Sequence, residues 1–124
     1  MAASLLLLIM SCSPGVSNQQ GTDPTVQEKG KRDYSEIYDN GQVKINGTLV
    51  DGKRHGLWVS YFENGLKWSE ENYYMGVRDG KAISYFSNGM LRYRGAYVDD
   101  VKAGLWTFYD EEGKVVKEVD FNEK

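Results

Sequence analysis

The sequence predicts an all-β fold, an elongated twisted meander sheet in which antiparallel β-hairpins form a single layer. Three observations predict it. Short motifs return every 24 residues, Asn-Gly dipeptides return in the same phase, and glycine interrupts every stretch that is long enough for a stable helix. A repeat of this length is typical of stacked supersecondary units.

Shifts in composition divide the chain into three segments. The apolar run Leu5–Met10 is far shorter than the roughly 20 residues needed to span a bilayer, and we interpret residues 1–11 as a signal peptide. Residues 12–33 are polar and contain both prolines, which predicts a flexible tether. Residues 34–124 are predicted to form one repeat domain of about three and a half 24-residue units.

Cys12 is the only cysteine of the chain, and it directly follows the apolar run and Ser11. This arrangement resembles the bacterial lipobox, in which a cysteine is lipidated and becomes the mature N-terminus. The resemblance implies several acyl chains, palmitate among them, and firm attachment to a membrane of the bacterial cell envelope, on its outer-membrane or periplasmic side. The alternative is a chance cysteine behind an ordinary signal peptide.

Runs rich in Val, Ile, Tyr, Phe and Trp predict about seven strands within the repeat domain. They span residues 43–50, 57–63, 66–74, 81–87, 90–98, 105–110 and 114–121. Tight Asn-Gly turns are predicted to alternate with wider connections that each close on a glycine. Glycine and asparagine indicate turns because both residues tolerate a positive φ. The wider connections are residues 51–56, 75–80 and 99–104. The predicted turn glycines are Gly41, Gly56, Gly65, Gly80, Gly89, Gly104 and Gly113.

The register of the hairpins has two solutions. A two-residue loop at Asn64-Gly65 places Tyr61 opposite Trp68, whereas a three-residue loop with a bulge places Tyr61 opposite Lys67. A slip of one residue exchanges the two faces of the sheet. The sequence therefore predicts which side chains recur together but not which face they occupy.

Aromatic residues that recur at the 24-residue step are predicted to form the repeat core. We expect two columns to stack from unit to unit. The first contains Tyr61, Tyr85 and Tyr109, and the second contains Leu49, Tyr73, Tyr97 and Phe121. Trp58 and Trp106 are expected to be buried over the glycine-rich turns.

Composition and charge argue against several classes of function. The chain has 15 Lys and Arg against 18 Asp and Glu, a net charge of −3, which does not suit nucleic acid binding. The only histidine, His55, has no second His or Cys partner and is interpreted as a solvated turn residue. We expect no catalytic residues, no metal site and no cofactor. Calcium at Asp99-Asp100 is the minor alternative.

Exposed aromatic residues are the candidate binding groups. Trp68, Tyr74 and Tyr93, together with Tyr73 and Tyr97, could form a platform for stacking sugars or a patch for a protein partner. The alternative is that a thin sheet needs most of these rings as its core. The long edges of such a sheet also suit the addition of an extended peptide.

The stretch from Asp51 to Gly65 carries a family resemblance. This stretch resembles the bacterial variant of the MORN repeat, in which Gly-Lys-x-x-Gly-x-Trp precedes two adjacent aromatic residues, two further residues and Gly. The resemblance covers about residues 34–124. The second copy is degenerate, with Ala82 at the Trp position and Val77 at the Lys position. The third has Asp100 where glycine is expected.

The resemblance implies a β-hairpin array and a non-enzymatic role. Proteins with this repeat, often exported lipoproteins, are similar to a group labelled the antitoxin component of a toxin–antitoxin system. We predict a membrane-tethered binding or scaffold lipoprotein with a protein partner. The alternatives are binding of envelope glycan or peptidoglycan through the aromatic residues, and an antitoxin that sequesters a toxin protein.

Overall fold

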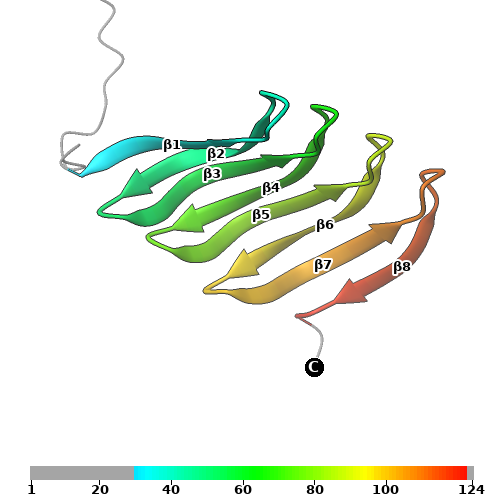
Figure 1. Cartoon of the computed structure of the whole chain (residues 1–124). Helices are drawn as coiled ribbons and strands as arrows, with labels where there is room; N and C mark the ends of the chain where they lie inside the picture. Colours follow the sequence, from blue (N-terminus) through cyan, green and yellow to red (C-terminus); the bar gives the residue numbers. More distant parts are fainter. Residues whose placement is uncertain (1–29, 123–124) are drawn as a thin grey trace, which may run out of the picture.

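The computed structural model describes residues 30–122, which form one open antiparallel sheet of eight strands (Figure 1). Each strand pairs with the strand before it and the strand after it, in the order β1 to β8. The strands are β1 (Lys31–Ile37), β2 (Val43–Val50), β3 (Lys53–Tyr61), β4 (Lys67–Tyr74), β5 (Val77–Tyr85), β6 (Leu91–Val98), β7 (Val101–Tyr109) and β8 (Val115–Asp120). This confirms the predicted all-β, single-layer array of hairpins.

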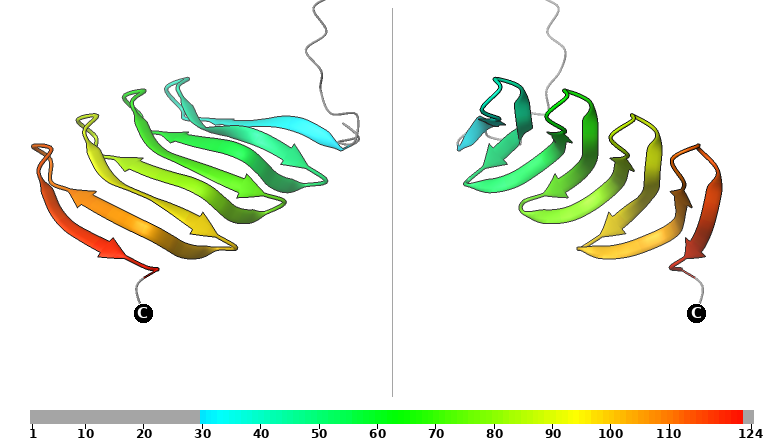
Figure 2. Two further views of the ribbon diagram at one scale, coloured as in Figure 1. Left: turned by 180° about the vertical axis from the view of Figure 1, so that it is seen from behind. Right: turned by 45° about the vertical axis from the view of Figure 1, so that its right-hand side comes forward.

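The predicted signal peptide and Cys12 lie outside the described residues, as does the predicted tether up to residue 29. Residues 30–122 contain no helix, and so none long and apolar enough to cross a membrane. The sheet forms a curved trough, with β1 and β8 as its two outer strands (Figure 2).

The first strand, β1, was not predicted, and the expected count of about seven strands was wrong. β1 begins at Lys31, before the domain boundary predicted at Tyr34. Its sequence is mostly polar, so no apolar run marks it. The signal that finds it is the period itself, because Tyr34 and Ile37 stand 24 residues before Trp58 and Tyr61.

The Asn-Gly turns are three-residue loops followed by a bulge. In the second such loop, the Gly65 amide donates to the Phe62 carbonyl at 2.9 Å, and the Phe62 amide donates to the Leu66 carbonyl at 2.8 Å. Gly65 has a φ of 86°, which a glycine adopts without strain. Tyr61 pairs with Lys67, so the second of the two predicted registers is the one observed.

The wider connections are shorter than predicted, and three of the predicted turn glycines lie inside strands. The turns themselves contain two residues, Asp51-Gly52 in the first case. Gly56 has a φ of 76° within β3, where the register with β2 shifts. Gly80 and Gly104 occupy the same position in β5 and β7. These glycines therefore bend a strand at an irregularity of pairing, and the prediction that they close a turn was wrong.

The two faces of the sheet carry different side chains. We call one the aromatic face, because its rings contact one another; it carries Tyr34, Trp58, Tyr73, Tyr93, Tyr97, Trp106 and Phe108. Across the opposite face a row of paired residues runs from strand to strand. This row consists of Asn46, Val59, Glu70, Ile83, Arg94, Thr107 and Glu118. A sheet without covering helices must bury its apolar groups on itself, and here the aromatic face does so.

Candidate interaction surface

Two buried tryptophans organise the aromatic face. The side chains of Trp58 and Trp106 are 3% and 1% exposed. Each indole N–H donates to a backbone carbonyl at 3.1 Å, that of Thr48 for Trp58 and that of Ala96 for Trp106. The structure therefore places both rings in the core and satisfies their only polar group.

Each tryptophan lies against a glycine of the preceding strand. A β-carbon at Gly47 would lie 2.3 Å from Cδ2 of Trp58, and a β-carbon at Gly95 would lie 2.2 Å from Cδ2 of Trp106. Neither glycine has a positive φ, so the need for glycine here is steric. The two Trp–Gly pairs stand 48 residues apart, two steps of the repeat.

The middle unit is built differently on this face. Ala82, at the tryptophan position, pairs directly with Glu71, at the glycine position. Ala82 is fully buried, and Tyr73 Oη donates to Glu71 Oε2 at 2.8 Å. Burial raises the pKa of Tyr73, and the hydrogen bond to Glu71 raises it further. The second unit thus has a carboxylate opposite a buried alanine where the other units have a glycine opposite an indole.

The rings gather around the two tryptophans as separate clusters. Trp58 contacts Tyr34 and Tyr73, with ring centroids at 5.4 and 6.5 Å. The second cluster is larger: the rings within 6.3 Å of Trp106 are those of Tyr93, Tyr97, Phe108 and Phe121. The pKa of Tyr93 is raised, first by burial and then by the charge of Glu71.

Three cations stand on these rings at the repeat spacing. We call Arg54, Arg78 and Lys102 the cation column. Arg54 Cζ lies 4.4 Å from the Trp58 ring centroid, Arg78 Cζ lies 4.2 Å from that of Tyr97, and Lys102 Nζ lies 4.8 Å from the Trp106 ring. Neighbouring members are two strands apart, which corresponds to about 10 Å. The column is therefore a regular line of positive charge along the aromatic face.

The members of the column differ in how far their charge is satisfied. Arg78 Nε lies 3.0 Å from Asp100 Oδ1, and this contact raises the pKa of Arg78. The pKa of Asp100 is lowered, first by the backbone N–H of Arg78 and then by its side chain. Arg54 donates to Tyr73 Oη at 3.3 Å. Within residues 30–122, neither Arg54 nor Lys102 has a carboxylate at salt-bridge distance.

The predicted binding residues do not form one platform. Trp68 is 47% exposed and stacks on Phe62 near an Asn-Gly loop, whereas Tyr74 is 63% exposed and contacts His55 beside a turn at the opposite end of β4. Tyr93 belongs to the Trp106 cluster. These three residues therefore share no aromatic platform, and Tyr93 packs against the core, as the alternative interpretation of these rings expected.

Two other sequence expectations change in the structure. Tyr61, Tyr85 and Tyr109 cannot stack directly on one another, because about 10 Å separates residues two strands apart. Tyr85 Oη instead donates to Glu70 Oε2 at 3.1 Å. His55 is not simply solvated, since its Nδ1 accepts a hydrogen bond from the Met75 amide at 3.2 Å.

The second predicted column also packs on tryptophan instead of on itself. Tyr73 contacts Trp58, and both Tyr97 and Phe121 contact Trp106. Leu49 and Tyr97 are buried, but Phe121 is 44% exposed because it follows the last strand, where no further unit covers it.

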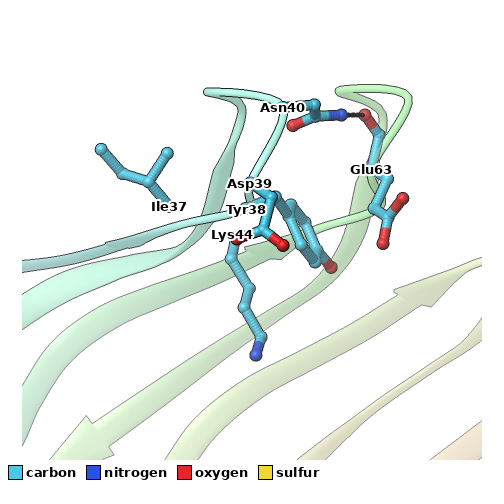
Figure 3. Close-up of a pocket in the computed structure, with 6 residues that line it drawn as sticks. All are labelled: Ile37, Tyr38, Asp39, Asn40, Lys44 and Glu63. Atoms are coloured by element: carbon cyan, nitrogen blue, oxygen red, sulfur yellow. Dashed lines mark hydrogen bonds between the residues drawn. The ribbon is translucent and has the colours of Figure 1, made fainter.

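The Asn-Gly loops are linked to one another by asparagine side chains. Asn40 Nδ2 donates to the Glu63 carbonyl at 2.9 Å (Figure 3). Asn64 and Asn88 make the equivalent bonds to Ser87 and Glu111 in the next loops. We call these bonds the asparagine ladder. Each asparagine also accepts a bond within its own loop through Oδ1, as Asn40 does from the Gln42 amide.

The hollow beside the first rung has a volume of about 400 Å³ and is lined by charges of both signs (Figure 3). Its lining residues are Ile37, Tyr38, Asp39, Asn40, Lys44 and Glu63. No nucleophile and base are paired there. No group of three His, Cys, Asp or Glu residues that could hold a metal ion occurs among residues 30–122.

Comparison with known protein families decides the assignment. The model of the MORN repeat variant matches residues 54–73, 78–99 and 102–123, which together make up more than half of the chain. The chain belongs to this family. MORN repeats commonly bind proteins or membranes and are not typically enzymes. No curated protein and no solved structure matches the chain.

The family match also bears on the cation column. The first match begins at Arg54, the second at Arg78 and the third at Lys102. The column is visible in the sequence as a cation at one phase of the repeat, but its position on the aromatic face depends on the register. The lipid on Cys12, the envelope location and the antitoxin label stay predictions.

Proposed function

We propose that this MORN-repeat chain is a non-enzymatic protein-binding module. A lipid on Cys12 holds the module at a membrane surface, and the cation column binds an acidic segment of its partner. One observation carries the proposal. Arg54, Arg78 and Lys102 recur at equal spacing on one face, and two of them have no carboxylate partner within the described part of the chain.

The spacing of the column suits a polyproline II helix. Such a helix has three residues per turn and rises about 3.1 Å per residue, so side chains three positions apart lie on the same side, about 9 Å from one another. Members of the cation column are about 10 Å apart. A segment with Asp or Glu at every third position would therefore meet one cation per turn.

The surroundings of the column favour such a ligand. Proline-rich segments bind to aromatic surfaces, and the half-buried rings of Tyr34, Tyr73 and Tyr93 lie on the same face as the cations. The Asp100 carboxylate already shows that Arg78 accepts an acidic partner, through Nε. A toxin protein with a segment of this kind would also satisfy the antitoxin interpretation.

Binding can be tested with the full-length chain and two labelled peptides. One carries Asp at every third position between prolines, and the other carries the same number of Asp residues at every fourth position. We expect fluorescence anisotropy to show tighter binding of the first, and we expect Arg54→Glu with Lys102→Glu to weaken it at least tenfold. Binding should also weaken as salt is added, because the cations are exposed.

Arg94→Glu is the matched control, since Arg94 is an exposed cation on the opposite face. Equal binding of both peptides, or equal weakening by Arg94→Glu, would refute the use of the column. Preferential binding of anionic phospholipid vesicles through Arg54 and Lys102 would replace the protein partner with a membrane surface.

The membrane attachment has its own test. We expect Cys12→Ser to move the full-length chain from the membrane fraction to the soluble fraction, because the proposed acyl chains attach to this sulfur. Ser11→Ala, beside it, should leave fractionation unchanged. Membrane fractionation of Cys12→Ser like that of the wild type would overturn the lipid anchor and leave the peptide experiment unaffected.

A further inference from the structure

The two outer strands, β1 and β8, each leave one edge unpaired within the described sheet. A free edge presents backbone N–H and C=O groups that can pair with another strand. Exposure is high along β1, where only Tyr34 is half-buried. The side chains of each edge determine which strand can pair with it.

The side chains of β1 are complementary to a second copy of β1. Arg32, Tyr34 and Glu36 alternate along the strand and so share one face, the aromatic face, on which Tyr34 contacts Trp58. If two copies pair antiparallel about a two-fold axis at Tyr34, Arg32 of each copy lies opposite Glu36 of the other. On the reverse side, Lys31 lies opposite Ile37, and Asp33 lies opposite Ser35.

Glu36 is already positioned close to this axis. Tyr34 Oη donates a hydrogen bond to Glu36 Oε1, so the carboxylate is held beside the ring and its second oxygen stays available. Opposite charges directly across a strand pair stabilise the pairing, and the two-fold axis generates the Arg32–Glu36 pair twice.

The other edge lacks this complementarity. Lys117 pairs with Phe108, on the aromatic face, whereas Glu118 and Asp120 lie on the opposite face. A two-fold axis perpendicular to the sheet keeps faces aligned, so Lys117 can never lie opposite either acid of a second β8. Self-pairing of β8 therefore brings together no opposite charges.

Head-to-tail stacking of β8 on β1 of another copy is also disfavoured, at the Asn-Gly loops. Continuing the repeat would place Lys117 opposite Glu36, which is favourable. The asparagine ladder, however, cannot continue, because Glu112 occupies the asparagine position of the last loop. Its carboxylate would face the Asp39 loop of the next copy without a proton to donate.

We propose that two copies of the chain associate edge to edge through β1, antiparallel about an axis at Tyr34, so that one sheet runs through both copies. A single strand pair buries little surface, so the association is weak and depends on concentration. If both copies are tethered to one membrane, their effective concentration rises and favours pairing. The proposal itself does not depend on the cation column.

A charge-swap series with the full-length chain tests the pairing. Sedimentation velocity over a wide range of concentrations should show the wild type shifting from monomer to dimer. Arg32→Glu and Glu36→Arg should each abolish the dimer, because like charges then face each other. The double variant R32E/E36R should regain it, since the two pairs are restored with their signs exchanged.

Lys117→Glu is the control for the other edge and should leave the dimer unchanged. Thermal unfolding of each variant checks that loss of the dimer is not loss of the fold. A wild type that stays monomeric at all concentrations, or a double variant that stays monomeric, would overturn the proposal. Growth beyond a dimer that Lys117→Glu abolishes would show head-to-tail stacking instead.

Discussion

The first and third repeat units differ from the second on the aromatic face, although all three have the same backbone plan. In the outer units a tryptophan ring lies on a glycine, as Trp106 does on Gly95. In the second unit Ala82 faces Glu71. A large residue needs a missing side chain opposite it, and a small residue allows a long one. Packing between neighbouring strands therefore accounts for the degenerate second repeat, in which both positions differ from those of the outer units.

The largest expected loss of stability comes from replacing Trp106 of the third unit by alanine, the residue that the second unit has at this position. Trp106→Ala leaves a cavity among four surrounding rings and should lower the free energy of unfolding by about 3–5 kcal/mol. Urea denaturation of the full-length chain measures it. Trp68→Ala is the control, because this ring is half-exposed and its removal should cost about 1 kcal/mol. Equal losses for the two variants would contradict the burial that distinguishes them.

Adding one carbon beneath the ring should cost nearly as much. The β-carbon of Gly95→Ala would overlap the Trp106 indole, which cannot move without disturbing its neighbours, and we expect a loss of about 3 kcal/mol. Glu71→Ala serves as the matched control at the same phase, where no tryptophan lies opposite. If Gly95→Ala unfolds at the wild-type urea concentration, the ring does not lie where the structure places it.

The second unit can be given the Trp–Gly pair of its neighbours by two substitutions. Ala82→Trp alone should overpack the face and cost about 1–3 kcal/mol. Combined with Glu71→Gly, it should recover most of that loss. A double-mutant cycle would then show a coupling of about 0.5–3 kcal/mol between the two positions. Strictly additive effects would mean that the residues at the two positions do not interact.

The smallest effect concerns an ion pair that only the second unit has. Lys67 Nζ lies 2.6 Å from Glu70 Oε1, and this contact, followed by the Tyr85 hydroxyl, lowers the pKa of Glu70. At the equivalent positions stand Asn46, Arg94 and Glu118, and Glu118 has Val115 where Glu70 has Lys67. Glu70→Gln should cost under about 1 kcal/mol near neutral pH.

The sign of its pH dependence follows from the lowered pKa. The folded state favours the charged carboxylate, so its contribution is present above the unfolded-state pKa of Glu70 and is lost as the pH falls through the folded-state value. Denaturation at a series of pH values should therefore show the wild type and Glu70→Gln converging in acid. A difference that grows in acid would have the wrong sign for this ion pair.

The sequence predicted the array because residues with positive φ mark its turns at a fixed phase. It could not show that Gly56 bends a strand while Gly65 closes a loop, since both positions require the same backbone conformation. Only the pairing of the neighbouring strand, which slips beside Gly56, separates the two cases.

The candidate site was less accessible to prediction. Arg54 and Lys102 stand in phase in the sequence, but their role depends on which face they share with the rings, and a one-residue slip would have reversed it. Tyr34 lies in a polar strand that no apolar run marks, and only the 24-residue step back from Trp58 indicates its position on the aromatic face. Of the candidate binding residues, Trp68 is half-exposed, whereas Tyr93 packs against Trp106.

The asparagine ladder has a consequence for how such a molecule can change length. Every interior loop receives one bond from the loop before it and gives one to the loop after it, through the same atoms. A duplicated 24-residue segment inserted between two loops could accept a hydrogen bond from the loop before it and donate one to the loop after it. Glu112 cannot give such a bond, so growth by duplication is open inside the array and closed at its C-terminal end.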